Sequence, residues 1–327
     1  MTTPRRKVII DCDTGVDDAL ALVLCLKNLE VVGITTVGGN VGLASTQRNT
    51  RYVTEVTGYT HVPVFAGYDR PMLEPLRDAS YVHGAGGLGP IEVPEPKKPL
   101  ESRHGVDYLI ETYMAHDDIT LITLGPLTNV AHALLREPRL AGRIPEILCM
   151  GGSATFGNAT PAAEFNIYTD PEAAKIVFES GIPIRMVGLN LTREQRVTPA
   201  LMAAAEAIDN DVARMVARLC GHVLARSGGT GSFCDACAVM WLVEPAVITK
   251  SLKLHVTVET RGEFTRGMTV CDTRPYAGAA PGVDIDRQWQ SEPSLPGKAP
   301  NVEVAMDLDQ EKFNEVLLDT LRRYSET

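Results

Sequence analysis

The stretch Val8-Ile9-Ile10-Asp11-Cys12-Asp13-Thr14-Gly15-Val16-Asp17-Asp18-Ala19-Leu20 decides the architecture of this chain. It opens as an apolar run typical of a buried strand and continues into an Ala/Leu-rich pattern typical of a helix. Between the two lie four carboxylates within eight residues, around one glycine. Gathering like charges beside an apolar core is costly unless a cation offsets them, and oxygen-only ligands favour Ca²⁺ or Mg²⁺.

A solvated acidic turn is the alternative interpretation of this stretch. It explains Asp17 and Asp18, because carboxylates are favourable at a helix N-terminus. It does not explain Asp11 and Asp13, which end a strand that we expect to be buried on both faces. The turn therefore predicts a metal or substrate site.

Composition excludes several classes of partner. The 327 residues are 44% hydrophobic and carry a net charge of −10, which argues against nucleic-acid and anionic-membrane partners. We find neither a membrane-spanning apolar run nor a signal-peptide core. Seven cysteines, an odd number, are scattered along the chain, which predicts a reducing, cytoplasmic environment rather than a disulfide framework.

Strand-like and helix-like segments alternate from residue 7 to residue 187. This order predicts an α/β fold: a mostly parallel central sheet with helices on both faces and right-handed crossovers. Two domains are compatible with the length, but no composition break appears, so one domain over residues 1–327 is the simpler interpretation. Further expected features are a long loop (67–99), helices (199–226, 234–244 and 309–324), a strand pair (252–259 and 267–271) and a Pro/Gly-rich segment (273–300).

Polar or glycine-rich clusters follow several predicted strands, at residues 11–18, 38–40, 124–129 and 150–166. Ligands of open α/β sheets bind at the carboxyl ends of strands. Each cluster alone is compatible with an ordinary turn. Together they predict one crevice, with the active site at the strand C-terminal ends.

A second informative stretch holds Asn158, Glu164 and Asn166 in a loop between a strand and a helix. Amide and carboxylate groups supply both donors and acceptors, which suits the hydroxyl groups of a sugar. An Asx-rich turn without a ligand is the alternative.

The third stretch is Phe233-Cys234-Asp235-Ala236-Cys237, at the start of an apolar helix. Asp235 is either a helix-start carboxylate or a further metal ligand. The cysteine spacing resembles a redox or zinc pair, but a second pair is missing and Cys237 would face the core.

Taken together, these motifs resemble the calcium-dependent nucleoside hydrolases of the inosine/uridine-preferring type. The resemblance begins at the acidic turn and continues through Val37-Gly-Gly-Asn40, Leu124-Gly-Pro-Leu-Thr-Asn129 and Met150-Gly-Gly. It includes Gly157-Asn158-Ala-Thr, Ala163-Glu164-Phe165-Asn166 and Asp235-Ala-Cys-Ala, and so spans about residues 7–245 in order. An acidic motif combined with a distant Asn-x₅-Glu-x-Asn is far more specific than one short motif.

The resemblance implies an N-glycosidase that hydrolyses ribonucleosides to free base and ribose. It implies that Ca²⁺ is held by Asp13, Asp18, Asp235 and the backbone carbonyl of Leu124, with Asp13 the general base on a Ca²⁺-bound water. It also implies supporting residues around the ribose: Asp17 and Asn166 at the 2′-hydroxyl, Asn158 and Glu164 at the 3′ and 5′ side, Asn40 and Met150 lining the sugar pocket, and Asp11 orienting the loop. A homodimer or homotetramer is the assembly that the family leads us to expect.

The chain departs from the family at the residue that protonates the leaving base. Studied members carry a His immediately before the last metal-binding Asp, and that His protonates the base; here the position is Cys234. A thiol is mostly protonated at neutral pH but is a weak donor, so an acid and a hydrophobic filler are both possible roles. His222 is either a substitute or a solvated helix residue, and His83, in a glycine-rich loop, is the better candidate for base contact.

Two other functions remain as alternatives. A haloacid-dehalogenase-like, Mg²⁺-dependent phosphohydrolase also starts with a strand and Asp-x-Asp, which would make Asp11 the nucleophile. Gly15 does not fit that motif, and the Asn-x₅-Glu-x-Asn stretch would be unexplained. A non-catalytic nucleoside-binding protein would account for Cys234, but the complete set of predicted metal ligands argues against it.

Overall fold

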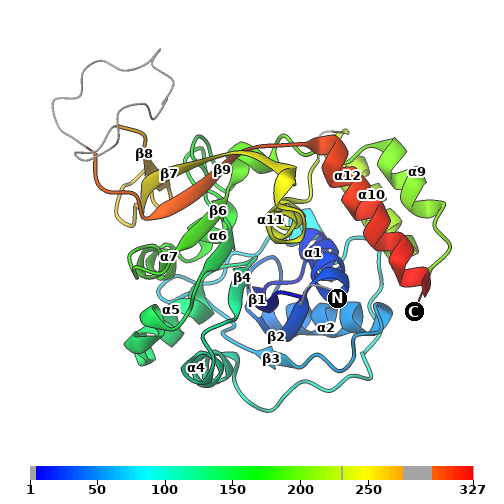
Figure 1. Ribbon diagram of the computed structural model, residues 1–327, viewed down its shortest axis with the longest axis horizontal. Coiled ribbons are helices and arrows are strands. Elements are labelled where there is room, and N and C mark those ends of the chain that lie inside the picture. Colours follow the sequence, from blue (N-terminus) through cyan, green and yellow to red (C-terminus); the bar gives the residue numbers. More distant parts are fainter. Residues whose placement is uncertain (1–4, 230, 275–296, 327) are drawn as a thin grey trace.

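The strand that precedes the acidic turn, β1 (Lys7–Cys12), lies inside a nine-stranded sheet of order β3-β2-β1-β4-β5-β6-β9-β7-β8. The structure is a computed structural model and describes residues 5–229, 231–274 and 297–326. From β3 to β9 in this order neighbouring strands pair in parallel, whereas β7 pairs antiparallel with both β9 and β8. The prediction of a mostly parallel central sheet is confirmed (Figure 1).

The elements alternate along the chain as expected. The other strands are β2 (Glu30–Thr36), β3 (Val64–Ala66), β4 (Thr120–Thr123), β5 (Ile147–Met150), β6 (Ile184–Val187), β7 (Ile248–Val258), β8 (Thr269–Asp272) and β9 (Val302–Leu308). The helices are α1 (Val16–Asn28), α2 (Leu43–Val56), α3 (Ser80–His83), α4 (Gly105–Ala115), α5 (Thr128–Arg136), α6 (Phe165–Thr169), α7 (Pro171–Phe178), α8 (Leu189–Thr192), α9 (Pro199–Glu206), α10 (Asp211–Ser227), α11 (Cys234–Val243) and α12 (Gln310–Arg322).

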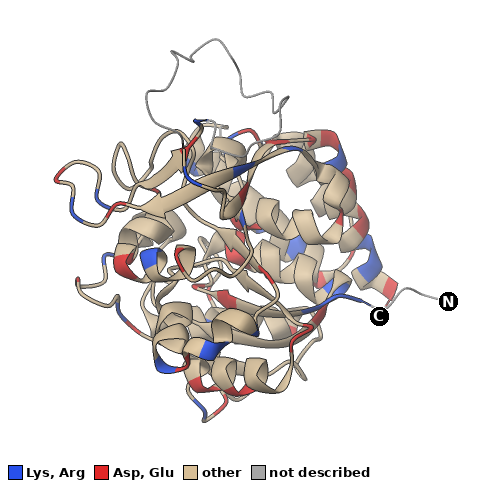
Figure 2. Ribbon diagram, turned by 60° about the vertical axis from the view of Figure 1, so that its left-hand side comes forward, with Lys and Arg blue, Asp and Glu red and all other residues tan. Residues whose placement is uncertain are grey.

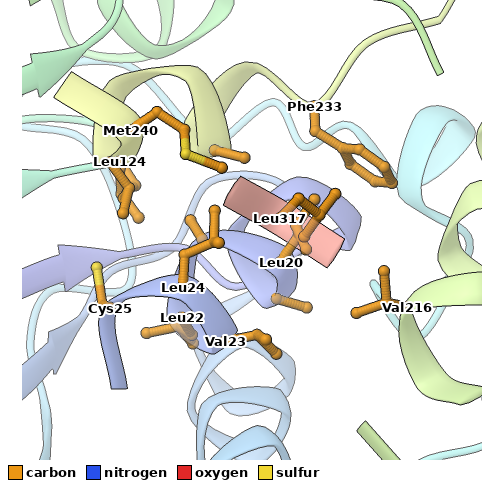
Figure 3. Close-up of a cluster of buried hydrophobic side chains, with 14 of the residues drawn as sticks. Leu20, Leu22, Val23, Leu24, Cys25, Leu124, Val216, Phe233, Met240 and Leu317 are labelled. Atoms are coloured by element: carbon orange, nitrogen blue, oxygen red, sulfur yellow. The ribbon is translucent and has the colours of Figure 1, made fainter. Parts of the chain in front are cut away.

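Two apolar cores lie on opposite faces of the sheet. Helices α4, α5 and α7 cover one face, and α1, α2 and α11 pack on the other (Figure 1). Helices α9, α10 and α12 form a further layer outside α1, which explains why α1 is apolar on nearly all sides. Figure 3 shows this packing: Leu20 of α1 lies among Phe233, Val216 of α10 and Leu317 of α12. The acidic turn is therefore anchored at both ends by buried elements.

Several predicted segments differ from the structure. The single helix expected over 199–226 is two helices, because Asn210 starts α10 as an N-cap whose Oδ1 accepts from the N–H of Ala213 at 2.7 Å. Strand β9 was not predicted; it is inserted between β6 and β7. The late strand pair is confirmed as the antiparallel pair β7–β8. Most of the Pro/Gly-rich segment lies outside the described residues.

Charged residues of both signs are interspersed over the outer elements (Figure 2). Among the helices of the described residues, none combines the length and apolar character that crossing a bilayer requires.

Candidate active site

The acidic turn between β1 and α1 places its four carboxylates at different depths. Asp11, Asp13 and Asp18 are buried, and Asp17 is partly exposed. Asp11 Oδ1 accepts from Thr35 Oγ1 at 2.5 Å and from Asn129 Nδ2 at 2.7 Å, so it ties β1 to β2 and α5. Burial raises the pKa of Asp11 to about 6. These contacts support the predicted role of Asp11 as a residue that orients the turn.

Asn40 braces the next two carboxylates. Its backbone N–H donates to Asp13 Oδ2 at 2.6 Å, and its side-chain Nδ2 donates to Asp18 Oδ2 at 3.0 Å. The N–H of Gly15 also donates to Asp18 Oδ2, at 2.9 Å. One oxygen of each carboxylate is thereby fixed, whereas the other, Oδ1, is buried and has no hydrogen-bond partner in the described part of the chain.

Two glycines let the backbone approach Asp13 closely. A Cβ on Gly39 would lie 2.0 Å from Asp13 Oδ2, and a Cβ on Gly125 would lie 2.7 Å from Asp13 Oδ1. No real side chain tolerates such separations, so both positions require glycine. The glycines in the clusters after β2 and β4 therefore serve to enclose the Asp13 carboxylate.

Asp235 joins this group from the first turn of α11. Ligand oxygens of Asp17, Asp18 and Asp235 lie within 4.8 Å of one another, and the Asp18 carboxyl also contacts that of Asp13. Burial raises the pKa of Asp13 and of Asp235 well above its ordinary value, and the neighbouring carboxylates raise it further. The same causes raise the pKa of Asp18 to about 7.

The arrangement fits a hard divalent cation. Buried, unpaired carboxylate oxygens are costly, and oxygen donors that converge in this way are what such a cation binds. Of the predicted ligands, Asp13, Asp18 and Asp235 lie together. The carbonyl of Leu124 accepts from Asn166 Nδ2 at 2.8 Å, and its second lone pair remains for a cation.

The predicted sugar-binding residues are held by backbone groups. Glu164 caps α6: its Oε1 accepts from the N–H of Asn166 at 3.0 Å, and its Oε2 accepts from Gly152 at 2.9 Å and Ile167 at 3.2 Å. Burial raises the pKa of Glu164 to about 7. Asn158 Oδ1 accepts from the N–H of Phe165 at 2.8 Å, which leaves the amide NH₂ group of Asn158 for a ligand. These side chains are oriented before any substrate binds.

A cavity of about 410 Å³ opens above the carboxylates, within the range of small-molecule sites. The predicted site residues that line it are Asp17, Asn40, His83, Leu124, Met150, Asn158, Glu164, Asn166, His222, Cys234 and Asp235. Asp11, Asp13 and Asp18 do not line it and are buried. The structure therefore brings together residues from seven separated parts of the sequence.

At one end of the cavity, His83 contacts the acidic turn. The N–H of Val16 donates to His83 Nδ1 at 3.1 Å, and Asp17 Oδ1 lies 3.8 Å from the same nitrogen. Because Nδ1 accepts a hydrogen bond, the ring proton is on Nε2. Burial lowers the pKa of His83, so the imidazole is neutral near pH 7.

His222 and Cys234 also line the cavity. His222 is not a solvated helix residue, one of its two predicted roles, because it is partly buried and its Nε2 lies 2.9 Å from the carbonyl oxygen of Val82. Burial raises the pKa of the Cys234 thiol to about 11, and its Sγ lies 3.7 Å from Ser232 Oγ. Cys237 is buried and donates to the carbonyl of Phe233 at 3.3 Å, as expected for a core residue.

Comparison with known proteins decides the family. The model of the "Inosine-uridine preferring nucleoside hydrolase" family matches residues 8–315. The chain belongs to the inosine-uridine preferring nucleoside hydrolase family.

Relatives and a solved structure agree with this assignment. The chain is 37% identical to the "Inosine-uridine preferring nucleoside hydrolase" of Crithidia fasciculata, over 97% of this chain and 98% of that protein. It is 37% identical to "Pyrimidine-specific ribonucleoside hydrolase RihA" of Salmonella paratyphi A, over 97% of this chain and 99% of that protein. A plant nucleoside hydrolase, the PpNRh1 enzyme, superposes with a TM-score of 0.85 at 29% identity, covering 98% of this chain and 99% of its own.

Nucleoside hydrolases cleave the N-glycosidic bond of ribonucleosides, and this chain is an enzyme of that class. The family assignment leaves the phosphohydrolase alternative without support. It also argues against a non-catalytic nucleoside-binding protein, since the matched relatives are hydrolases.

Sequence reasoning missed some residues of the nucleoside hydrolase cavity. Tyr81, Phe165, Arg226 and Ser232 also line it. Arg226 could have been predicted from His222, since it lies one helical turn later on the same face of α10. Ser232 carries no such signal in the sequence.

Proposed function

We propose that the chain hydrolyses ribonucleosides to free base and ribose with Asp13 as the general base and Ca²⁺ as the bound cation. The observation that carries this proposal is the pair of buried, unpartnered Oδ1 atoms of Asp13 and Asp18 beneath a cavity lined by Glu164 and Asn166. Asp13, Asp18, Asp235 and the Leu124 carbonyl would hold the ion. When bound, Ca²⁺ would supply Lewis-acid polarisation of a water molecule and of the ribose diol.

Side chains of the protein accept the proton of the water and stabilise the charge that develops on the ribose. Asp13 has one oxygen fixed by Asn40 and the other free, so it is oriented to accept the proton of the attacking water. Breaking the N-glycosidic bond develops positive charge on the ribose ring, and the carboxylates of Asp17 and Glu164 stabilise that charge electrostatically. Because a water rather than a side chain attacks, the configuration at C1′ inverts.

The leaving base receives a hydrogen bond from a neutral donor rather than a proton from a strong acid. His83 is neutral with its proton on Nε2, so it offers an N–H to a ring nitrogen or carbonyl oxygen of the base. The Cys234 thiol stays protonated and contributes at most a weak hydrogen bond.

A panel of purine and pyrimidine ribonucleosides, read by the appearance of reducing sugar, tests the proposal. Metal-replete protein should release ribose, and Asp13→Asn should reduce turnover by about 10²-fold or more, the usual contribution of a general base. Asp118→Asn, at an exposed aspartate that pairs with Lys7, is the matched control. Absence of ribose from every common ribonucleoside would show that the proposed reaction is wrong.

We further propose a cytoplasmic homodimer or homotetramer. All seven cysteines are free, which supports a reducing compartment. The assembly rests on the family, and light scattering coupled to size-exclusion chromatography measures it directly.

A further inference from the structure

One face of α10 binds a run of backbone carbonyls in the segment 79–91, which we call the base-side loop. Three side chains spaced four residues apart share this face, as residues at i, i+4 and i+8 do in a helix. Their partners are as follows: Arg218 Nη2 donates to the carbonyl of Pro90 at 2.9 Å, His222 Nε2 to that of Val82 at 2.9 Å, and Arg226 Nη1 to that of Tyr81 at 2.5 Å. The loop is therefore fastened to α10 at three points.

The contact between His222 and the Val82 carbonyl fixes the tautomer of His222. A carbonyl oxygen only accepts, so Nε2 of His222 carries the proton. Gly89, with φ +57°, packs against the same ring: a Cβ at this position would lie 2.7 Å from His222 Cγ. The Nε2–H of His222 is thus used by the loop.

The residue after Val82 is His83, which is held from the opposite side. The N–H of Val16, at the start of α1, donates to His83 Nδ1 at 3.1 Å. His222 therefore fixes the peptide that leads into His83, while α1 fixes the His83 ring. With Nδ1 occupied, the Nε2–H is the remaining polar group of a side chain that lines the cavity.

We propose that His222 is a positioning residue that holds the Val82 carbonyl and thereby aims the Nε2–H of His83 at the leaving base. It transfers no proton itself. The proposal rests on the proposed function, because it assumes that His83 meets the base of a nucleoside.

Two variants of His222 separate positioning from general structural support. Glutamine places its amide NH₂ close to the position of Nε2 and keeps the bond to Val82, whereas leucine removes it. His222→Leu should lower kcat on nucleosides roughly 10- to 100-fold, the scale expected for misplacement of a catalytic group. It should change turnover of a nitrophenyl riboside by less than about 3-fold, because nitrophenolate leaves without a donor. His222→Gln should restore most of the nucleoside activity.

A double-variant cycle tests the route through His83. In a His83→Asn background, His222→Leu should have little further effect on nucleoside turnover, because the group that it positions is gone. His255→Leu is the matched control: this histidine also contacts a backbone carbonyl, that of Ala299 at 3.1 Å, but it lies on β7 and does not line the cavity. Equal losses on both substrates, additive effects in the cycle, or a His222→Gln variant as slow as His222→Leu would each overturn the proposal.

A spectroscopic measurement keeps this inference distinct from the reaction itself. Spectra of ¹⁵N-histidine-labelled protein should show His222 and His83 protonated at Nε2, and His222→Leu should shift the His83 signals. If wild-type protein releases no ribose but these shifts occur, the positioning stands and the proposed function falls. If the His83 signals are unchanged in His222→Leu, the positioning role is wrong whatever the activity.

Discussion

The backbone N–H of Val16 donates to Nδ1 of His83 across 3.1 Å, although 67 positions separate the two residues. The bond satisfies a donor at the N-terminus of α1, a position whose N–H has no partner within the helix. It also fixes the tautomer of His83. One contact therefore serves the stability of the acidic turn and the orientation of a side chain that lines the cavity.

His83→Asn and His83→Leu should separate these two roles. Asparagine keeps an acceptor for the Val16 N–H but loses the Nε2–H, so Tm should stay near that of the wild type while nucleoside turnover falls roughly tenfold or more. Leucine loses both, and should also cost about 1 kcal/mol of stability, as loss of a helix cap does. Thermal melts and steady-state kinetics measure the two effects, and full turnover in His83→Asn would exclude a base contact.

Chelation of divalent cations should abolish activity, and added Ca²⁺ should restore it. The reason is that a cation would stabilise the buried, unpartnered oxygens of Asp13 and Asp18 in their ionised form. A cation that binds only the folded state should also raise Tm in a concentration-dependent way. Asp18→Asn should shift the activation curve to higher Ca²⁺ concentrations. Unchanged turnover after exhaustive chelation would contradict the assigned metal site.

Glu164→Gln should remove a pH-dependent loss of stability and weaken catalysis. The folded-state pKa of Glu164, about 7, lies above its ordinary value of 4.5. The native state therefore holds the proton more tightly, and ionisation lowers stability as pH rises from about 4.5 to about 7. Above pH 7 the loss reaches about 3 kcal/mol at most, which glutamine avoids.

Denaturant unfolding at pH 4.5 and pH 8 measures this effect on metal-free protein. Glutamine replaces one oxygen that accepts backbone N–H bonds by an NH₂ group, which has the same cost at both pH values. The stability of the variant relative to wild type should therefore rise between pH 4.5 and pH 8, whereas that of Glu263→Gln, at an exposed glutamate, should not change. Turnover of Glu164→Gln should fall because the ribose loses a charged acceptor. A variant whose stability relative to wild type does not rise between the two pH values would contradict this assignment.

Cys234→Ala should have only a small kinetic effect. Because burial raises the pKa of this thiol to about 11, it offers a weak hydrogen bond, and its loss should lower turnover less than about fivefold. The effect should be similar for nucleosides and for a nitrophenyl riboside. A large loss confined to nucleosides would identify Cys234 as the acid of the leaving base.

Most of the fold was predictable because its signals are local. The apolar run of β1, the Ala/Leu pattern of α1 and the repeated strand–helix order set the parallel sheet. Strand β9 was missed although Val302-Glu-Val-Ala305 alternates, because the adjoining Pro/Gly-rich segment and helix dominated the pattern. Its place beside β6 depends on pairing with a strand more than a hundred residues earlier, which no local pattern specifies.

In the site, too, local patterns could be predicted from the sequence and contacts between distant segments could not. The acidic turn, the Asn158–Asn166 stretch and their convergence at strand ends were predictable, because residue type and topology are sufficient for these. Only in the folded chain does His83 accept from the N–H of Val16, and only there does His222 of α10 bind the base-side loop. These contacts join loop backbone to distant side chains, so they depend on the path of the chain in space rather than on periodicity or motif.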